Sequence, residues 1–267
     1  MITTAELKNR LEVALEASWR AGRITLEYYQ STPAVQTKDD GSPVTQADLE
    51  AEREIRRLIT RHFPDDAIVG EEGEKDFSRA GRSARAGGTW YIDPIDGTRS
   101  FVCGVPFYGV LIAFETEGES LLGTVNFPAL NESIWAMRGE GCYWNGRRAR
   151  VSQVGRLQEA TLLTTDSYQM EKSGYQASWQ EFCAATKIQR TWGDAYGHMM
   201  VATGRAEIMI DPKMSVWDCG PLLPILAEAG GRFTDWDGAA TIHGTNAFST
   251  NGLLHEEVRK LLLLCPK

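Results

Sequence analysis

Two aspartates, Asp93 and Asp96, have the residue types and spacing best suited to chemistry in this 267-residue chain. They end the apolar run 90–92, and Gly97 and Thr98 follow directly. A buried strand that ends in paired acids can hold a divalent cation, and the next two residues offer backbone N–H groups and a hydroxyl at the same place. The pattern indicates metal-assisted chemistry on a phosphate. The ordinary alternative is a strand followed by a turn, because Asp-Gly is a common turn dipeptide.

Other acids stand at the ends of predicted elements. Glu71 and Glu72 follow a short apolar strand, Asp218 opens a helix, and Asp48 lies in the first turn of another helix. Each also has an ordinary alternative, either as part of a solvated loop or as a first-turn acid that the helix dipole favours. Together they offer the all-oxygen ligand set that Mg²⁺ prefers, although spacing alone does not bring them together.

These motifs resemble the signature set of the inositol monophosphatase family, whose members are Mg²⁺-dependent, lithium-sensitive phosphatases of small phosphate monoesters. The resemblance extends over essentially the whole chain. It is carried by Glu71 and Glu72, the run 93–98, Trp217 and Asp218, and Gly230 and Gly231. It implies an α/β fold, the layered α-β-α-β-α sandwich of the inositol monophosphatase and fructose-bisphosphatase type, and a homodimer.

The resemblance implies metal-binding roles for five residues. Glu71 matches a glutamate that binds metal and orients the attacking water. Asp93 matches a carboxylate that bridges two metals, and the carbonyl of Ile95 matches a backbone ligand of the first metal. Asp96 and Asp218 match ligands of the second metal that also border the substrate. The expected cofactor is two or three Mg²⁺ ions, which would offset the negative charge of the phosphate and activate water.

The resemblance also implies how the phosphate and the water are held. Thr98 matches a hydroxyl that helps orient the nucleophilic water, and the backbone N–H groups of Gly97 and Thr98 match phosphate donors. Asp48 matches an acid that supports Thr98 and a metal-bound water. The predicted catalytic set is therefore Glu71, Thr98 and Asp48. The four histidines of the chain lie far from these motifs in the sequence, which fits an activated water rather than a side-chain nucleophile.

Substrate choice is expected to depend on the second half of the chain. Asp194 falls in the run 190–197, and Asp211 ends a predicted strand. Both positions are also common for ordinary helix-start and turn acids. Inositol enzymes carry a small neutral residue and a glutamate at the matching positions, so two aspartates here favour a positively charged substrate. Arg190 is expected to brace the pocket or a dimer face, with a purely structural role as the alternative.

The run 190–197, together with Trp217 and Asp218, resembles the histidinol-phosphate phosphatase branch of the family. The leading hypothesis is hydrolysis of L-histidinol phosphate to L-histidinol and phosphate, a step of histidine biosynthesis. An inositol 1-phosphate phosphatase or a broad sugar phosphatase is the alternative within the family. A catalytically silent scaffold would predict a damaged metal set, whereas the acids above are all present.

Hydrophobic periodicity predicts two differently built halves packed as one unit. Residues 1–148 are expected to be α+β with an antiparallel sheet and most metal ligands, and residues 149–267 to be α/β with the specificity residues. Loops are expected at 31–44 and 73–88, and a hairpin turn at Asn145 and Gly146. Predicted helices cover 3–30, 45–62, 175–185, 193–203, 217–229 and 254–264. Predicted strands cover 67–70, 89–93, 106–115, 121–127, 132–138, 161–165, 187–190, 206–211 and 231–235.

The first helix is expected to begin with a capping box between Thr3 and Glu6. Its buried stripe is expected to contain Leu7, Leu11, Leu15, Trp19, Leu26 and Tyr29.

Composition narrows the possible partners. The net charge of −8 and the isoelectric point near 5.2 disfavour binding to nucleic acid or to anionic membranes. The five cysteines are scattered and form no Cys-x-x-Cys pair. We therefore expect neither a disulfide framework nor a zinc cluster, and we expect a cytoplasmic location. No apolar window approaches the roughly 18 residues of a membrane span. The expected partner is a small phosphate monoester.

Overall fold

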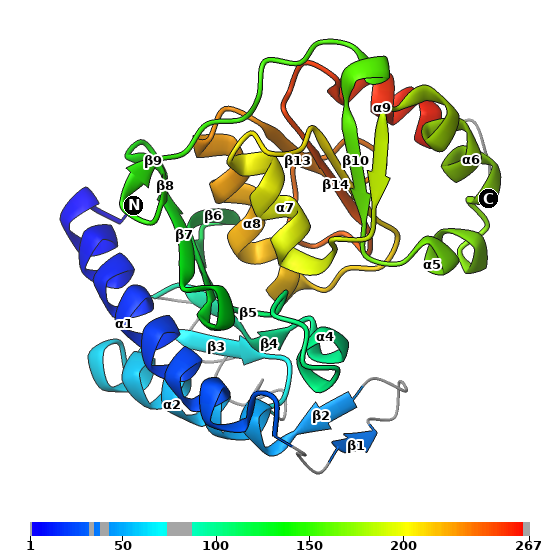
Figure 1. Ribbon diagram of the computed structural model, residues 1–267. Helices are drawn as coiled ribbons and strands as arrows, with labels where there is room; N and C mark the ends of the chain where they lie inside the picture. The colour runs from blue at the N-terminus through cyan, green and yellow to red at the C-terminus, as the bar shows by residue number, and fades with distance from the viewer. Residues whose placement is uncertain (1, 32–34, 38–42, 74–86, 264–267) are drawn as a thin grey trace.

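The computed structural model in Figure 1 describes residues 2–31, 35–37, 43–73 and 87–263. Most of the predicted loop 73–88 and part of the predicted loop 31–44 lie outside these residues. Within 31–44, the structure differs from the prediction. Strands β1 (Val35–Thr37) and β2 (Pro43–Thr45) form a short antiparallel pair. Three-residue strands rich in β-branched side chains are too short for hydrophobic alternation to reveal them.

The first outer layer consists of two helices, α1 (Thr4–Tyr28) and α2 (Gln46–His62). The predicted capping box of α1 is confirmed, since Thr3 Oγ1 accepts from the Glu6 N–H and Glu6 Oε2 accepts from the Thr3 N–H. The predicted stripe is wrong for Trp19 and for Leu26, which are 62% and 37% exposed. Small residues occupy most of the buried face, because they allow close approach to α2 and to the sheet behind it: Ala14, Ala17, Ser18, Ala21, Gly22 and Thr25. The larger buried residues of α1 are Leu7, Leu11 and Val13.

The second layer is a sheet of seven strands in sequence order. The first two strands are parallel and the others pair antiparallel. Side chains alternate along the sheet, so that Trp90 and Ile92 pack toward α1 and α2 while Tyr91 packs toward the centre of the molecule. The strands are β3 (Ala67–Gly70), β4 (Thr89–Asp96), β5 (Gly109–Thr116), β6 (Glu119–Phe127), β7 (Glu132–Met137), β8 (Gly141–Trp144) and β9 (Arg147–Arg148).

The middle layer contains α7 (Asp194–Ala202) and α8 (Val216–Glu228), which pack between the two sheets (Figure 1). Helix α8 approaches the first sheet so closely that a Cβ at Gly123 would lie 2.3 Å from the carbonyl oxygen of Pro221. Glycine is therefore required at that contact. The close packing fixes where the start of α8 lies relative to the end of β4.

The fourth layer is a sheet of five strands in the order β11-β10-β12-β14-β13. Strand β10 pairs in parallel with both neighbours, while β14 pairs antiparallel with β12 and β13. The sequence predicted four of these strands and missed the fifth, β14, which lies in a turn-rich segment. The strands are β10 (Thr161–Thr164), β11 (Ile188–Arg190), β12 (Ile208–Asp211), β13 (Arg232–Thr234) and β14 (Ala247–Thr250).

The last layer covers the far face of the second sheet with α5 (Ser167–Lys172), α6 (Gln176–Ala185) and α9 (His255–Leu262). Helix α5 was not predicted because its six residues are shorter than two helical turns. The whole arrangement confirms the predicted α-β-α-β-α sandwich. The two sheets fall within 67–148 and 161–250, and the boundary at 148/149 stays a prediction. Of the helices described, none is both long enough and apolar enough to span a membrane.

Candidate active site

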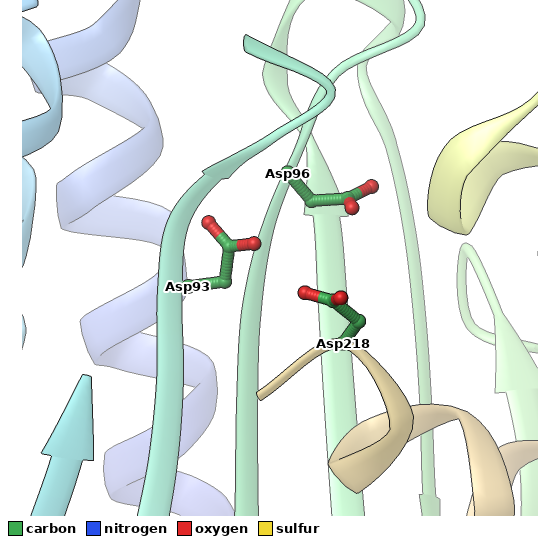
Figure 2. Close-up of side chains that lie close together, drawn as sticks. All are labelled: Asp93, Asp96 and Asp218. Carbon is green, nitrogen blue, oxygen red and sulfur yellow. The ribbon is translucent and has the colours of Figure 1, made fainter. Parts of the chain in front are cut away.

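Three carboxylates from two distant segments meet at the end of the first sheet (Figure 2). Asp93 and Asp96 come from the end of β4, and Asp218 comes from the first turn of α8. One carboxylate oxygen from each lies within 4.8 Å of the others. The pairing of β4 with β5 shifts register between Asp93 and Asp96, and such irregularities change where side chains point. The predicted acids of 93–98 and of 217–218 are thus brought together.

Backbone N–H groups fix the orientation of each carboxylate. The Ile95 N–H donates to Asp93 Oδ1 at 3.0 Å, and the Ala195 N–H donates to Asp96 Oδ2 at 2.8 Å. The Ser215 N–H donates to Asp218 Oδ2 at 2.7 Å. The side chains are therefore held in place before any ligand arrives, and they point toward one another (Figure 2).

Burial and mutual repulsion make this cluster unfavourable for charge. Burial, followed by the charges of Glu71, Asp96 and Asp218, raises the pKa of Asp93 well above its usual value. Burial, followed by the charge of Asp194, does the same to the pKa of Asp96. Burial is also the main reason why the pKa of Asp218 rises to about 7. A cation would relieve this repulsion, and an all-oxygen donor set suits a hard divalent ion.

Glu71 adds its charge to the same cluster. It follows β3, and its N–H donates to the Ile92 carbonyl at 3.2 Å, which ties it to β4. Its charge raises the pKa values of Asp93 and Asp218. Sequence reasoning missed the support for this segment. This support comes from Glu52, which is only 3% exposed. Its carboxylate accepts a hydrogen bond from the Glu72 N–H at 2.9 Å and forms an ion pair with Arg56.

Asp48 is both a helix cap and a candidate site acid. Its Oδ2 accepts from the N–H and the hydroxyl of Thr45, at 2.7 and 2.6 Å. Its Oδ1 is buried and has no hydrogen-bond partner among the described residues. Burial, opposed by the Thr45 bonds and aided by the charge of Glu71, raises its pKa. An orphaned buried oxygen is costly, so Oδ1 is suited to hold a water or a metal-bound group.

Gly97 and Thr98 form a tight turn between the end of β4 and the next helix. Gly97 has a φ of +77°, a region that favours glycine, and Thr98 begins the short helix α4 (Thr98–Val102). The Thr98 hydroxyl donates to the Ile95 carbonyl at 3.0 Å. The hydroxyl predicted to orient the water and the carbonyl predicted to bind metal are therefore in contact with each other. Among the described residues, Thr45 rather than Thr98 donates to the Asp48 carboxylate.

A cavity of about 540 Å³ opens beside the three carboxylates. It contains six of the seven predicted substrate residues: Asp96, Gly97, Thr98, Asp194, Asp211 and Asp218. Arg99, Thr165, Asp166, Gln169 and Lys213, which the sequence did not single out, also line it. Arg190 does not. It is exposed, donates to the Gln189 carbonyl at 2.7 Å, and places its guanidinium 5.9 Å from the centre of the Trp192 ring.

Asp194 is the first residue of α7 and lines this cavity. Its φ is +53°, and its N–H donates to the hydroxyl of Thr165 at 2.7 Å. A Cβ at Gly97 would lie 3.0 Å from Asp194 Oδ2, so glycine makes room for this carboxylate. Burial, followed by the charges of Asp211 and Asp218, raises the pKa of Asp194 to about 7, while Arg99 opposes the shift.

Asp211 lies at the end of β12, is 3% exposed, and is held on both oxygens. The Thr165 N–H donates to Oδ1 at 3.1 Å, and His198 Nε2 lies 3.3 Å from Oδ2. The other ring nitrogen of His198 is 2.8 Å from the Ser249 hydroxyl. Sequence reasoning missed His198 and Thr165, because their contacts join separate elements and follow no local spacing.

Comparison with known proteins agrees with this geometry. The model of the inositol monophosphatase family matches residues 6–263. A histidinol-phosphatase of Chlorobaculum parvum is 42% identical over 90% of this chain and 94% of its own. A histidinol-phosphatase of Mycobacterium tuberculosis is 36% identical over 93% of this chain and 95% of its own. The solved structure of a Thermotoga maritima IMPase superposes with a TM-score of 0.85 at 32% identity, over 95% of this chain and 96% of that one. The chain is a phosphoric monoester hydrolase and belongs to the inositol monophosphatase family.

Proposed function

We propose that this enzyme hydrolyses L-histidinol phosphate to L-histidinol and phosphate, with Mg²⁺ as its cofactor. The observation that carries the proposal is a pair of acids, the half-buried Asp194 and the buried Asp211, in the same cavity as the clustered carboxylates. A phosphate monoester with a cationic leaving group would place its two ends on these two groups of acids.

The residues at the end of β4 fit the metal. Asp93, Asp96 and Asp218, with Glu71 and the Ile95 carbonyl, would hold two or three Mg²⁺ ions. When bound, these ions would neutralise the phosphate dianion and supply an activated water. The close grouping of the three aspartate oxygens and the raised pKa values of their carboxyl groups support the assignment.

The chain's own groups would position phosphate and water. The N–H groups of Gly97 and Thr98 would donate to the phosphate oxygens, with Asp96 and Asp218 beside them. Glu71, the Thr98 hydroxyl and Asp48 would orient the attacking water. The orphaned Asp48 Oδ1 supports this assignment, because that atom needs a donor that the described residues do not provide.

The leaving group would be read by charge. Histidinol carries an ammonium and an imidazole, and each can form a charge-assisted hydrogen bond with a carboxylate. Asp194 and Asp211 repel each other. A cationic leaving group bound between them would relieve this repulsion, whereas a neutral leaving group would not. The similarity to the histidinol-phosphatases of Chlorobaculum parvum and Mycobacterium tuberculosis supports the same substrate.

A second substrate class remains as the alternative: inositol 1-phosphate, or a broad range of sugar phosphates. The similarity to the Thermotoga maritima IMPase favours it. The two proposals differ in the charge of the leaving group, since inositol offers hydroxyls and no cation.

The test is a kinetic comparison of L-histidinol phosphate with inositol 1-phosphate, each with Mg²⁺ and after chelation. We expect Mg²⁺-dependent phosphate release with a kcat/KM at least about tenfold higher for L-histidinol phosphate, the value of one charge-assisted hydrogen bond. Equal or better turnover of the inositol ester would favour the alternative substrate. Release that survives chelation would contradict the metal assignment.

Two further parts of the proposal come from family analogy: the enzyme would be inhibited by lithium and would form a homodimer. A cytoplasmic location would fit the scattered cysteines. Arg190 would then act either in its own pocket or across the dimer face, and its exposed position outside the cavity is compatible with the second role.

A further inference from the structure

Thr165 lies between the two acids on the leaving-group side of the cavity. It directly follows β10 and contacts both acids with different groups. Its N–H donates to Asp211 Oδ1 at 3.1 Å, and its hydroxyl oxygen accepts from the Asp194 N–H at 2.7 Å. One residue therefore connects two acids that come from separate elements, α7 and β12.

The contact with the Asp194 segment is unusually close. A Cβ at Gly193 would lie 2.2 Å from the Thr165 Cα, so only glycine lets the start of α7 pack against Thr165. Asp194 itself has a φ of +53°, a conformation that most non-glycine residues avoid. The hydrogen bond to the Thr165 hydroxyl helps hold this conformation, which brings the Asp194 carboxylate against Gly97.

The two acids differ in the partners that their carboxylate oxygens already have within the protein. Asp211 is braced by Thr165 on one oxygen and by His198 on the other. For Asp194, the favourable charge that acts on its carboxylate within the described part of the chain comes from Arg99. Asp194 is thus the acid with more capacity for a ligand cation, and its direction depends on the backbone that Thr165 holds.

We propose that Thr165 is a positioning residue that fixes Asp194 and Asp211 as one two-carboxylate site for a positively charged leaving group. The inference rests on the proposed function, because it requires a substrate whose leaving group is cationic. Thr165 acts through the two acids and needs no contact with the substrate itself.

The test compares Thr165→Val with Thr165→Ser in the Mg²⁺-loaded enzyme. Valine keeps the shape and the backbone N–H but removes the acceptor for the Asp194 N–H, whereas serine keeps the acceptor. We expect Thr165→Val to lower kcat/KM for L-histidinol phosphate about tenfold more than for inositol 1-phosphate. The loss should appear mainly in KM, and Thr165→Ser should keep the wild-type ratio of the two esters. Thr165→Ala serves as a smaller second variant if the valine variant does not fold.

Thr164→Val is the matched control. Thr164 precedes Thr165, and its hydroxyl is buried without a hydrogen-bond partner among the described residues, so its removal should change neither ester's kinetics. Equal losses on both esters in Thr165→Val would reduce Thr165 to a structural role and overturn the inference. An unchanged ratio in Thr165→Val would overturn it as well. A wild-type enzyme that does not distinguish the two esters is a different failure, because it removes the proposed function on which the inference rests.

Discussion

Asp93 shows how the needs of folding and of chemistry conflict at a single residue. Its side chain is 2% exposed and faces Glu71, Asp96 and Asp218. Burial without a counter-charge disfavours an ionised carboxylate. The protein keeps this arrangement although neutral residues would pack there at lower cost, as expected where stability is given up for function.

Asp93→Asn tests this conflict. The amide removes the repulsion but loses a carboxylate ligand, so the metal-free variant should unfold at a higher temperature than the metal-free wild type. Its Mg²⁺-dependent hydrolysis should fall about a hundredfold or more. Calorimetry after chelation and phosphate release check the two parts. Asp237→Asn, at an exposed position, should change neither. A metal-free Asp93→Asn protein less stable than wild type would contradict the account.

At the residue scale, the sequence predicted the acids that adjacent motifs display. Asp93, Asp96 and Asp218 stand in recognisable runs, and the structure brings them together. Thr165 and His198 were beyond such reasoning, because neither stands in a recognisable motif and both contact acids that come from other elements or from a distant part of the chain. Their partners become visible only when α7, β10 and β12 are placed in space.

At the element scale, α8 carries two prolines in its interior, Pro221 and Pro224. Proline lacks the N–H that would donate to the carbonyl four residues earlier, so Pro224 leaves the Gly220 carbonyl without its helical donor. The Ser120 hydroxyl donates to that carbonyl at 2.8 Å. The sheet thus completes the helix, and this contact helps hold α8, whose first turn carries Asp218, against β6.

Ser120→Ala should therefore lower the free energy of unfolding by about 1 kcal/mol, a loss of roughly 2–4 °C in the thermal midpoint. In a Pro224→Ala background the helix regains its own donor, and the same change should cost less. Ser178→Ala is the control, since the Ser178 hydroxyl is buried without a partner among the described residues. Equal costs in both backgrounds would show that the Ser120 bond does not replace the missing helical one.

Most long elements were predictable from the sequence. The hydrophobic period is clear in α2, whereas β4 contains a short continuous apolar run and α8 is apolar over most of its length. The failures have physical causes. Trp19 is large and apolar yet exposed, because the face of α1 that packs against α2 uses small residues. The short elements β1, β2, β14 and α5 depend on tertiary partners more than on their own sequence period.

At the scale of the whole molecule, five layers bring the ends of β4, α7, α8 and β12 to one cavity. The cavity concentrates acids whose pKa values are raised, with those of Asp194 and Asp218 near 7 against 3.8 as the ordinary value. Between about pH 4 and pH 7 the folded protein binds more protons at these groups than the unfolded chain. Their contribution to stability therefore falls as the pH rises through this window.

Metal should remove this pH penalty. With chelator present, the acids lower stability more at pH 8 than at pH 5, while saturating Mg²⁺ binds the ionised site of the folded state. The rise in thermal midpoint on adding Mg²⁺ should therefore be larger at pH 8. His255, whose pKa burial lowers to about 4, destabilises the fold as the pH falls below about 6.5. Comparing the protein with and without Mg²⁺ at one pH cancels this term. A larger rise at pH 5 would contradict the account.

The central claim is that metal chemistry and charge recognition lie on two sides of one cavity. The most direct test measures kcat/KM for L-histidinol phosphate and inositol 1-phosphate in the wild type and in Asp194→Asn, with saturating Mg²⁺. The account predicts a wild-type preference for L-histidinol phosphate that shrinks about tenfold or more in the variant, because the charge-assisted bond is lost. Equal losses on both esters, or no preference in the wild type, would contradict it.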